Sequence, residues 1–242
     1  MSLELEHVAV SYGANPILRD VTARLEPGQI VGLIGPNGTG KSTQAELLAD
    51  YFRAQNEKTL VVEEPGSSDL SKSTPVANYL RSLIKNGNLA RSGEINLALF
   101  SAARRELWQQ KIAPALEQGI TVISARNYLS TLVYQGYGEG LSLDYIRDTT
   151  ALFTSERYLH PNHTIILTIN DETERNKRIA KRGQLTAPDT FESRSTSFQR
   201  QLNKGYSVLA RDLCLPMIDC IATDGRRKTA EEIAAEIQAI II

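Results

Sequence analysis

The sequence lacks an excess of either charge, a long apolar run and a pattern of paired cysteines. Its 242 residues hold 27 Lys and Arg against 28 Asp and Glu, a formal net charge of −1. This balance argues against a nonspecific polyanion binder, because no global basic excess is there to release counterions from nucleic acid. The longest apolar runs, such as 164–169, have the length of a strand and are too short to span a bilayer. We therefore expect neither a nucleic-acid nor a membrane partner.

Cysteine is scarce as well. Cys214 and Cys220 are the two cysteines of the chain, and their spacing matches no metal or redox motif. Two buried thiols in a reducing compartment are the favoured interpretation, with a disulfide as the alternative. The first residues also lack the basic and then apolar pattern of a secretory signal, so we expect a cytoplasmic protein.

Strand-like and helix-like segments alternate along the chain after an initial pair of strands. Period-two or buried apolar runs predict strands at 3–13, 17–29, 30–34, 59–66, 119–125, 163–169 and 216–221. Helical spacing predicts helices at 42–52, 76–116 (broken near 86–88 and at 93), 127–135, 141–153, 172–182, 191–213 and 229–242. This order predicts an α/β fold, a three-layer sandwich with a mainly parallel sheet and an N-terminal antiparallel strand pair within 1–28. No repeat or low-complexity linker divides residues 1–242, so we expect a single domain.

The strongest motif is GPNGTGKS at 35–42, which fits G-x4-G-K-[ST] between a strand and a helix. Its glycines let backbone N–H groups surround a phosphate, and the helix N-terminus adds partial positive charge. Lys41 is expected to reach the β- and γ-phosphates of ATP, and the Ser42 hydroxyl to ligate Mg²⁺. The predicted nucleotide-binding residues are Gly35, Pro36, Asn37, Gly38, Thr39, Gly40, Lys41, Ser42 and Thr43.

Residues 1–43, ending in LEPGQIVGLIGPNGTGKST, resemble the opening of an ABC-type ATPase domain. That resemblance implies that Tyr12 stacks on adenine, whereas Tyr12 otherwise simply ends a strand. No LSGGQ-like signature follows, and no apolar strand ends in Asp-Glu. An ABC ATPase subunit is therefore disfavoured.

From Lys41 onward the chain resembles the thymidylate kinase family. The matching segments are EEPGSS at 63–68, the run at 97–141 that contains STLVYQGYGEG, RIAKRG at 178–183 and DTFESRSTSFQRQLNKGY at 189–206. The resemblance implies a P-loop nucleoside monophosphate kinase that transfers the γ-phosphate of ATP to a pyrimidine deoxynucleotide, above all dTMP. It further implies a lid loop at about 182–190, and a homodimer formed through the helices around 76–116.

The same resemblance assigns roles to individual residues. Phe100 is expected to stack on the acceptor's pyrimidine ring, and Arg104, one helical turn later, to donate to a base carbonyl. The alternative is that Phe100 belongs to the core and Arg104 is a solvated charge. Thr131 and Tyr134 fall where the family contacts the base edge and the sugar, and the remaining expected substrate-binding residues are Ser130, Gln135 and Glu64.

Phosphoryl transfer needs alignment and charge neutralisation more than a general base. The catalytic residues expected from the resemblance are Lys41, Arg126, Arg178 and Arg182. Arg126 would bridge the donor and acceptor phosphates. Arg178 and Arg182 share a helix face beside the lid, from which both would close over the moving group.

Four departures from the family pattern lie around the phosphates. Asn37 and Ala125 stand where the family has acids, Glu63 where it has the arginine for the acceptor phosphate, and Thr190 where an arginine is frequent. Glu63 and Glu64 end a predicted strand next to the loop, where a carboxylate that organises Mg²⁺ could replace the missing acid. Of the two, Glu64, with Ser42, is the predicted Mg²⁺ ligand. Two alternatives stay open: a nucleotide-binding regulatory protein with a degenerate kinase body, and a kinase with another acceptor.

Overall fold

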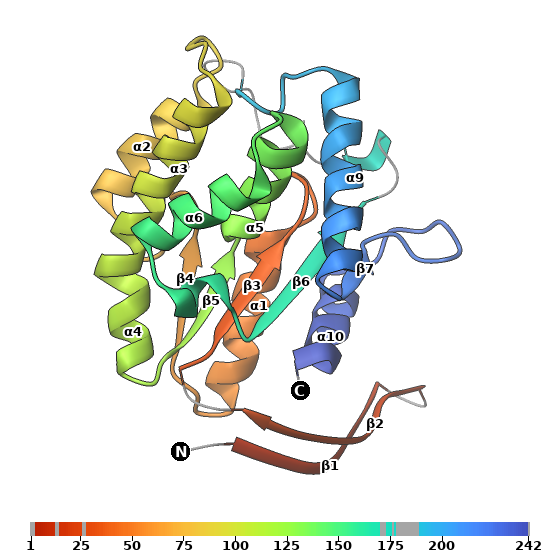
Figure 1. The fold of residues 1–242 in the computed structure, drawn as a ribbon. Coiled ribbons are helices and arrows are strands. Elements are labelled where there is room, and N and C mark those ends of the chain that lie inside the picture. Colours follow the sequence, from red (N-terminus) through yellow and green to blue (C-terminus); the bar gives the residue numbers. More distant parts are fainter. Residues whose placement is uncertain are drawn as a thin grey trace.

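In the computed structural model, residues 3–12, 15–25, 28–169, 173–175, 177 and 189–241 are described, the first two ranges as backbone only. A five-stranded sheet forms its centre (Figure 1). The strands are β3 (Ile30–Ile34), β4 (Thr59–Glu63), β5 (Thr121–Ala125), β6 (His163–Thr168) and β7 (Met217–Asp219). Their order is β4-β5-β3-β6-β7, and all four pairings are parallel.

The central strand β3 is apolar and buried along its whole length, as expected for a strand covered on both faces. From β3 the chain continues to β4, at one edge of the sheet. Later it passes from β5 to β6, which lies on the opposite side of β3 in the strand order. Residues 35–40 therefore leave β3 at a topological switch point, where open α/β sheets form their ligand crevice.

Helices cover both faces of the sheet, which confirms the predicted three-layer architecture. On one face α1 (Lys41–Ala54) packs beside α10 (Ala230–Ile241). The opposite face is covered by several helices, of which α3 (Gly93–Leu107) and α9 (Thr196–Asp212) are the longest (Figure 1). The other helices whose two ends lie in the described part of the chain are α2 (Pro75–Lys85), α4 (Ala113–Glu117), α5 (Tyr128–Thr131), α6 (Leu143–Phe153) and α7 (Glu156–Leu159), with π-helical segments at Trp108–Ile112 and Leu132–Gly138.

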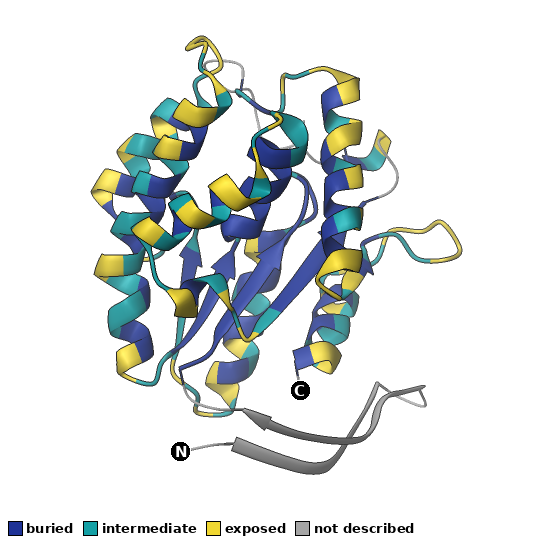
Figure 2. Cartoon of the chain, in the orientation of Figure 1, coloured by how far each residue is buried: buried dark blue, intermediate teal, exposed yellow. Residues whose placement is uncertain are grey.

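The strands of the central sheet are largely buried (Figure 2). Successive strand residues belong to two different apolar cores. Val61 on β4 and Ile123 on β5 lie in the core under α1, whereas Val62 and Val122 lie in the core on the other side. This is the period-two alternation of a pleated strand. It decides the direction of every side chain at the carboxyl ends of these strands.

The N-terminal strands β1 (Leu3–Tyr12) and β2 (Asn15–Leu25) pair antiparallel and form a two-stranded sheet of their own, which confirms the predicted strand pair. Figure 1 shows this pair at the amino-terminal end of the parallel strands, while residues 35–40 follow the carboxyl end of β3. This placement gives no support to an adenine contact by Tyr12, whose side chain lies outside the described part of the chain.

Some boundaries differ from the sequence prediction. The helix expected from 191 begins at Thr196, where the Ser195 side chain caps it by accepting from the Phe198 N–H at 3.3 Å. Residues 191 and 192 belong to a turn, in which Asp189 Oδ1 accepts from the backbone N–H groups of Phe191 and Glu192. Gly136–Gly138 continue a π-helical segment instead of opening a loop. Most of the helix predicted at 172–182 and most of the predicted lid lie outside the described residues. Among the helices that are described, none is long and apolar enough to cross a membrane.

Candidate active site

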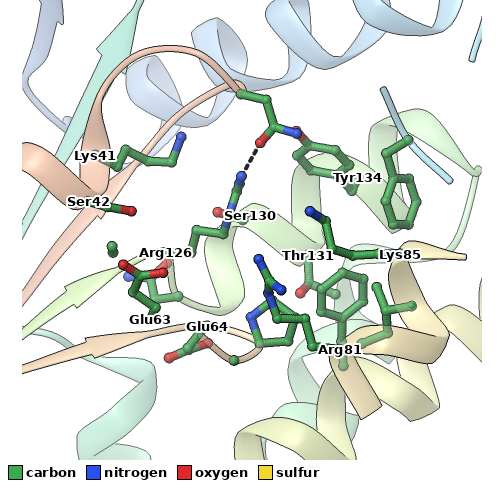
Figure 3. A pocket seen from close by; sticks show the side chains of 18 of the residues that line it. Lys41, Ser42, Glu63, Glu64, Arg81, Lys85, Arg126, Ser130, Thr131 and Tyr134 are labelled. Carbon is green, nitrogen blue, oxygen red and sulfur yellow. Dashed lines mark hydrogen bonds between the residues drawn. The ribbon is translucent and has the colours of Figure 1, made fainter. Parts of the chain in front are cut away.

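A cavity of about 380 Å³ opens at the carboxyl end of the sheet, within the size range of small-molecule sites. The phosphate loop and α1 form one end, and α2, α3 and α5 the other (Figure 3). Its walls include most of the predicted site residues: Asn37, Gly40, Lys41, Ser42, Thr43, Glu64, Phe100, Arg104, Arg126, Ser130, Thr131, Tyr134 and Gln135.

The backbone of the phosphate loop requires its glycines. Gly35 has φ 136°, and a Cβ placed there would lie 2.0 Å from the carbonyl oxygen of Leu167 on the neighbouring strand. Gly40 caps α1 in the left-handed region, with φ 87°. The loop therefore passes closely over the sheet and directs the N-terminus of α1 into the cavity, which is the geometry of an anion site.

Lys41 and Ser42 begin α1 at the floor of this loop. Lys41 is buried, and its Nζ donates to the Pro36 carbonyl at 2.7 Å and to Thr39 Oγ1 at 3.3 Å. Ser42 is exposed to the cavity. An ammonium and a hydroxyl thus stand together where the motif predicts the terminal phosphates and the metal.

Asn37 links two parts of the site. Its Oδ1 accepts from Arg126 Nη2 (dashed line in Figure 3), and its Nδ2 donates to Glu192 Oε1 at 2.5 Å. An amide can make this link because it carries both an acceptor and a donor, whereas an ionised carboxylate only accepts. Asn37 therefore connects Arg126 to the turn at 189–194.

Arg126 follows the last residue of β5 with a positive φ of 91°, which is rare for a residue with a Cβ. Its backbone N–H donates to Leu33 O at 2.9 Å and fixes this conformation. The side chain crosses the cavity toward the phosphate loop and passes Tyr134. Burial raises the pKa of Tyr134, and the charge of Arg126 partly offsets this rise, so the phenol stays neutral. Strained backbone of this kind is a mark of functional sites.

Glu64 is buried in a polar cluster on the other side of the sheet from α1. Its Oε2 accepts from Arg104 Nε at 3.0 Å and its Oε1 from the Tyr158 hydroxyl at 2.5 Å. Burial and the adjacent carboxylate raise the pKa of Tyr158 well above its ordinary value, which keeps this hydroxyl protonated as a donor. Both carboxylate oxygens are engaged, so the structure does not support the prediction that Glu64 binds metal.

Arg104 is only 2% exposed, so the alternative of a solvated charge is wrong. Its Nη2 donates to Thr131 Oγ1 at 3.1 Å, while Nη1 is buried without a hydrogen-bond partner in the described structure. Gln135 is similar: its Nε2 donates to Glu139 Oε2 at 3.0 Å, and its Oε1 is buried and unpaired among the residues described. Buried polar atoms without partners are costly and call for an explanation.

Phe100 is half-buried and meets the cavity beside a second aromatic ring. The centroid of Phe191 lies 6.0 Å from that of Phe100 and 5.3 Å from that of Tyr134, the latter in an edge-to-face contact. Three rings therefore enclose this end of the cavity. They form an apolar wall suited to a flat aromatic ligand.

The turn after the predicted lid is anchored to α2. Lys85 Nζ lies 3.6 Å from Asp189 Oδ2, and the Thr190 N–H donates to the Lys85 carbonyl at 3.1 Å. Thr190 Oγ1 accepts from Arg91 Nη2 at 3.0 Å, so a guanidinium does lie beside this position, from the segment between α2 and α3. Arg81, one turn before Lys85, also lines the cavity.

Sequence reasoning missed Arg81, Lys85, Tyr158 and the contact of Glu192 with Asn37. The spacing i, i+4 of Arg81 and Lys85 is a signal that could have placed both on one helix face. Nothing local to Tyr158 indicates its role, because its partners are far away in sequence. Arg178 and Arg182 lie outside the described residues, and their roles stay predictions.

A phosphate loop at the switch point, joined by one cavity to an aromatic and cationic pocket, defines a P-loop phosphotransferase with a small aromatic acceptor. The comparisons narrow this class. The family model for thymidylate kinase matches residues 34–233. The thymidylate kinase of Carboxydothermus hydrogenoformans is 31% identical over 214 residues, which are 88% of this chain and 97% of the relative. That of Deinococcus radiodurans is 33% identical over 90% of this chain and 98% of the relative.

The fold agrees with this relationship. A crystal structure of thymidylate kinase from Ehrlichia chaffeensis superposes with a TM-score of 0.67 and 23% identity, covering 88% of this chain and 98% of the other. The chain belongs to the thymidylate kinase family and is a nucleoside monophosphate kinase by descent.

Proposed function

We propose that this enzyme transfers the γ-phosphate of ATP to dTMP, giving ADP and dTDP. The observation that carries the proposal is the single cavity that joins the phosphate loop to a base pocket with unpaired polar atoms. In this reaction an oxygen of the acceptor phosphate forms the new P–O bond, and the bond between the β- and γ-phosphates breaks. The acceptor is already nucleophilic, so the protein has to align the two phosphates and neutralise their charge.

The base pocket fits thymine by hydrogen-bond polarity. Arg104 Nη1 is an unpaired donor for a carbonyl such as O4, and Gln135 Oε1 is an unpaired acceptor for an N–H such as N3–H. Cytosine has the opposite pattern at these two atoms, with an amino donor and an unprotonated ring nitrogen. Phe100 supplies the ring surface for stacking, and Ser130, Thr131 and Tyr134 complete the wall around base and sugar.

The phosphate end of the cavity suits transfer between two nucleotides. The loop N–H groups and Lys41 would hold the donor phosphates, and Arg126 would span both substrates from its fixed backbone. We further propose that Arg178 and Arg182 close over the site. A hydroxyl at Ser42 and donor phosphates fit Mg²⁺, which favours substrate phosphates together with one or two protein oxygens. Bound Mg²⁺ would neutralise the charge that develops on the transferring group.

The test is a coupled assay of ADP release with dTMP, dUMP, dCMP and dGMP as acceptors. We expect kcat/KM for dTMP and dUMP to exceed that for dCMP by at least about tenfold to a hundredfold, because each mismatched buried hydrogen bond costs about 1–3 kcal/mol. Lys41→Ala should abolish turnover with every acceptor. Turnover that is independent of acceptor, or unchanged in Lys41→Ala, would contradict the proposal. ATP binding without any acceptor turnover would favour the regulatory alternative instead.

A homodimer through α2 and α3 is the proposed assembly. Val76 and Tyr79 on α2 are 53% and 69% exposed, and Ile95 on α3 is 51% exposed. Large apolar side chains gathered on neighbouring helices suggest a covered surface. We expect Tyr79→Glu to shift the mass measured by light scattering from that of a dimer to that of a monomer. The control is Leu213→Glu, which changes an exposed apolar residue outside α2 and α3 and should leave the mass unchanged. A parent protein that is monomeric at micromolar concentration would refute this assembly.

The remaining proposals concern context. We propose that residues 1–242 act as one catalytic unit and that the enzyme works in the cytoplasm. In support of the latter, Cys214 and Cys220 are not joined in a disulfide, which suits a reducing compartment.

A further inference from the structure

The two carboxylates at the end of β4 point to opposite faces of the sheet. Val61 lies in the core under α1 and Val62 in the core on the other face. By the same alternation Glu63 faces α1 and Glu64 faces α3. The contacts agree, because Glu64 is engaged by Arg104 of α3, whereas Glu63 lines the cavity on the side of α1. Figure 3 shows Glu63 on the same side of the cavity as Ser42 and Lys41.

Glu63 stands beside the position of the missing acid. In the parallel ladder Glu63 pairs with Ala125, and Ala125 in turn pairs with Leu33 just before the phosphate loop. Residues paired in this way have side chains on the same face of the sheet. In P-loop enzymes an acid from a strand near the phosphate loop helps the loop's serine or threonine to hold Mg²⁺. Here β5, the strand next to β3, ends in Ala125. The following strand in the sheet, β4, places Glu63 beside Ala125.

The residues around Glu63 leave its carboxylate able to bind a cation in the cavity. Ala125 has no side chain beyond Cβ that would separate Glu63 from the α1 side of the cavity. The charged neighbour of Glu63 is Lys72, whose Nζ is held by Glu46 at 2.5 Å. The hydrogen bond that Lys72 donates to Glu46 is the main cause of the raised pKa of Lys72, and Glu63 adds to it only at longer range. Lys72 is therefore already paired.

We propose that Glu63, together with the Ser42 hydroxyl, holds the Mg²⁺ that accompanies ATP, in place of the acid that is absent at Ala125. This inference rests on the proposed kinase function and names the metal-binding carboxylate of that site. The described residues contain no group of three or more His, Cys, Asp or Glu able to hold a metal alone. The site is therefore completed by the nucleotide's own phosphates, as is usual for Mg²⁺. The charge reversal at 63 follows, because a carboxylate attracts the ion that an arginine would repel.

The experiment measures binding, without turnover. A non-hydrolysable ATP analogue is titrated into the full chain with EDTA or with excess Mg²⁺, and Mn²⁺ binding to the protein–analogue complex is followed by electron paramagnetic resonance. For Glu63→Gln we expect Mn²⁺ affinity to fall by at least about tenfold, as for loss of a group that supports a metal. Affinity for the metal-free analogue should stay equal or rise, since a negative charge beside the phosphates is removed. Loss of folding alone would lower both the affinity for Mn²⁺ and the affinity for the metal-free analogue.

A second variant moves the carboxylate back to the neighbouring strand. Glu63→Gln with Ala125→Asp should recover most of the Mn²⁺ affinity, while Glu117→Gln, an exposed carboxylate on α4, should match the parent. Equal Mn²⁺ affinity in parent and Glu63→Gln would overturn the metal assignment and leave the kinase proposal standing. Absence of analogue binding in the parent, with or without metal, would instead refute the kinase proposal itself.

Discussion

Glu64→Leu is expected to lower the free energy of unfolding by about 3–5 kcal/mol, the usual cost of breaking one side of a buried ion pair. The side chains of Glu64 and Arg104 are 2% and 3% exposed, so neither charge is solvated by water. Without the carboxylate, the Arg104 guanidinium keeps only the hydroxyl oxygens of Thr131 and Tyr158. The measurement is urea denaturation of the purified protein, with the midpoint and the slope both recorded.

The control lies one residue away, at the last residue of β4. Glu63→Leu removes a carboxylate of the same size from the more open face of β4, and it should change the free energy of unfolding by less than about 1 kcal/mol. A similar loss in both variants would mean that the polar cluster around Arg104 is not what stabilises this end of the sheet.

Arg126→Ala is expected to lower kcat for dTMP by about 10³-fold, the order found when a guanidinium that stabilises a transferring phosphoryl group is removed. The KM for ATP should change much less, because the loop N–H groups and Lys41 remain. Steady-state kinetics at saturating ATP and dTMP measure the change, with Arg53→Ala, an exposed arginine in α1, as the matched control.

A companion variant separates catalysis from backbone strain. Glycine adopts φ 91° without the penalty that a Cβ carries, so Arg126→Gly should be at least as stable as Arg126→Ala while equally inactive. If either variant kept more than a tenth of the parent kcat, Arg126 would have no central part in phosphoryl transfer.

The fold was predictable where the sequence is locally consistent. The apolar run at Ile30–Ile34 followed by GPNGTGKS identifies β3 and its loop from residue types alone. The order of the strands was not predictable, because the parallel pairings join segments far apart in the sequence, and that of β3 with β6 joins residues more than a hundred apart. The start of α9 was misplaced for a local reason, since two residues there can cap a helix: Asp189 accepts from two N–H groups of a turn, and the helix itself begins after the cap at Ser195.

The candidate site shows the same division. Phe100 and Arg104 share one end of the cavity, as their helical spacing predicts. EEPG offers two adjacent carboxylates, and the sequence does not show which face of the sheet α1 covers. The sequence therefore could not decide between them, and Glu64 was predicted as the metal ligand. Once that face is known, alternation along β4 separates the two residues. The contact of Tyr158 with Glu64 joins α7 to the segment after β4, which are far apart in the sequence, so no local pattern predicts it.

The amide at Asn37 has a consequence for how this site can change by mutation. Its two ends are matched to a cation, Arg126, and an anion, Glu192. Asn37→Asp alone would place two carboxylates, the new one at 37 and that of Glu192, at the 2.5 Å contact that the amide now makes. We therefore expect this single substitution to be unfavourable. Glu192 has to change first or together with it. We therefore expect the effect of Asn37→Asp to depend on which residue stands at 192.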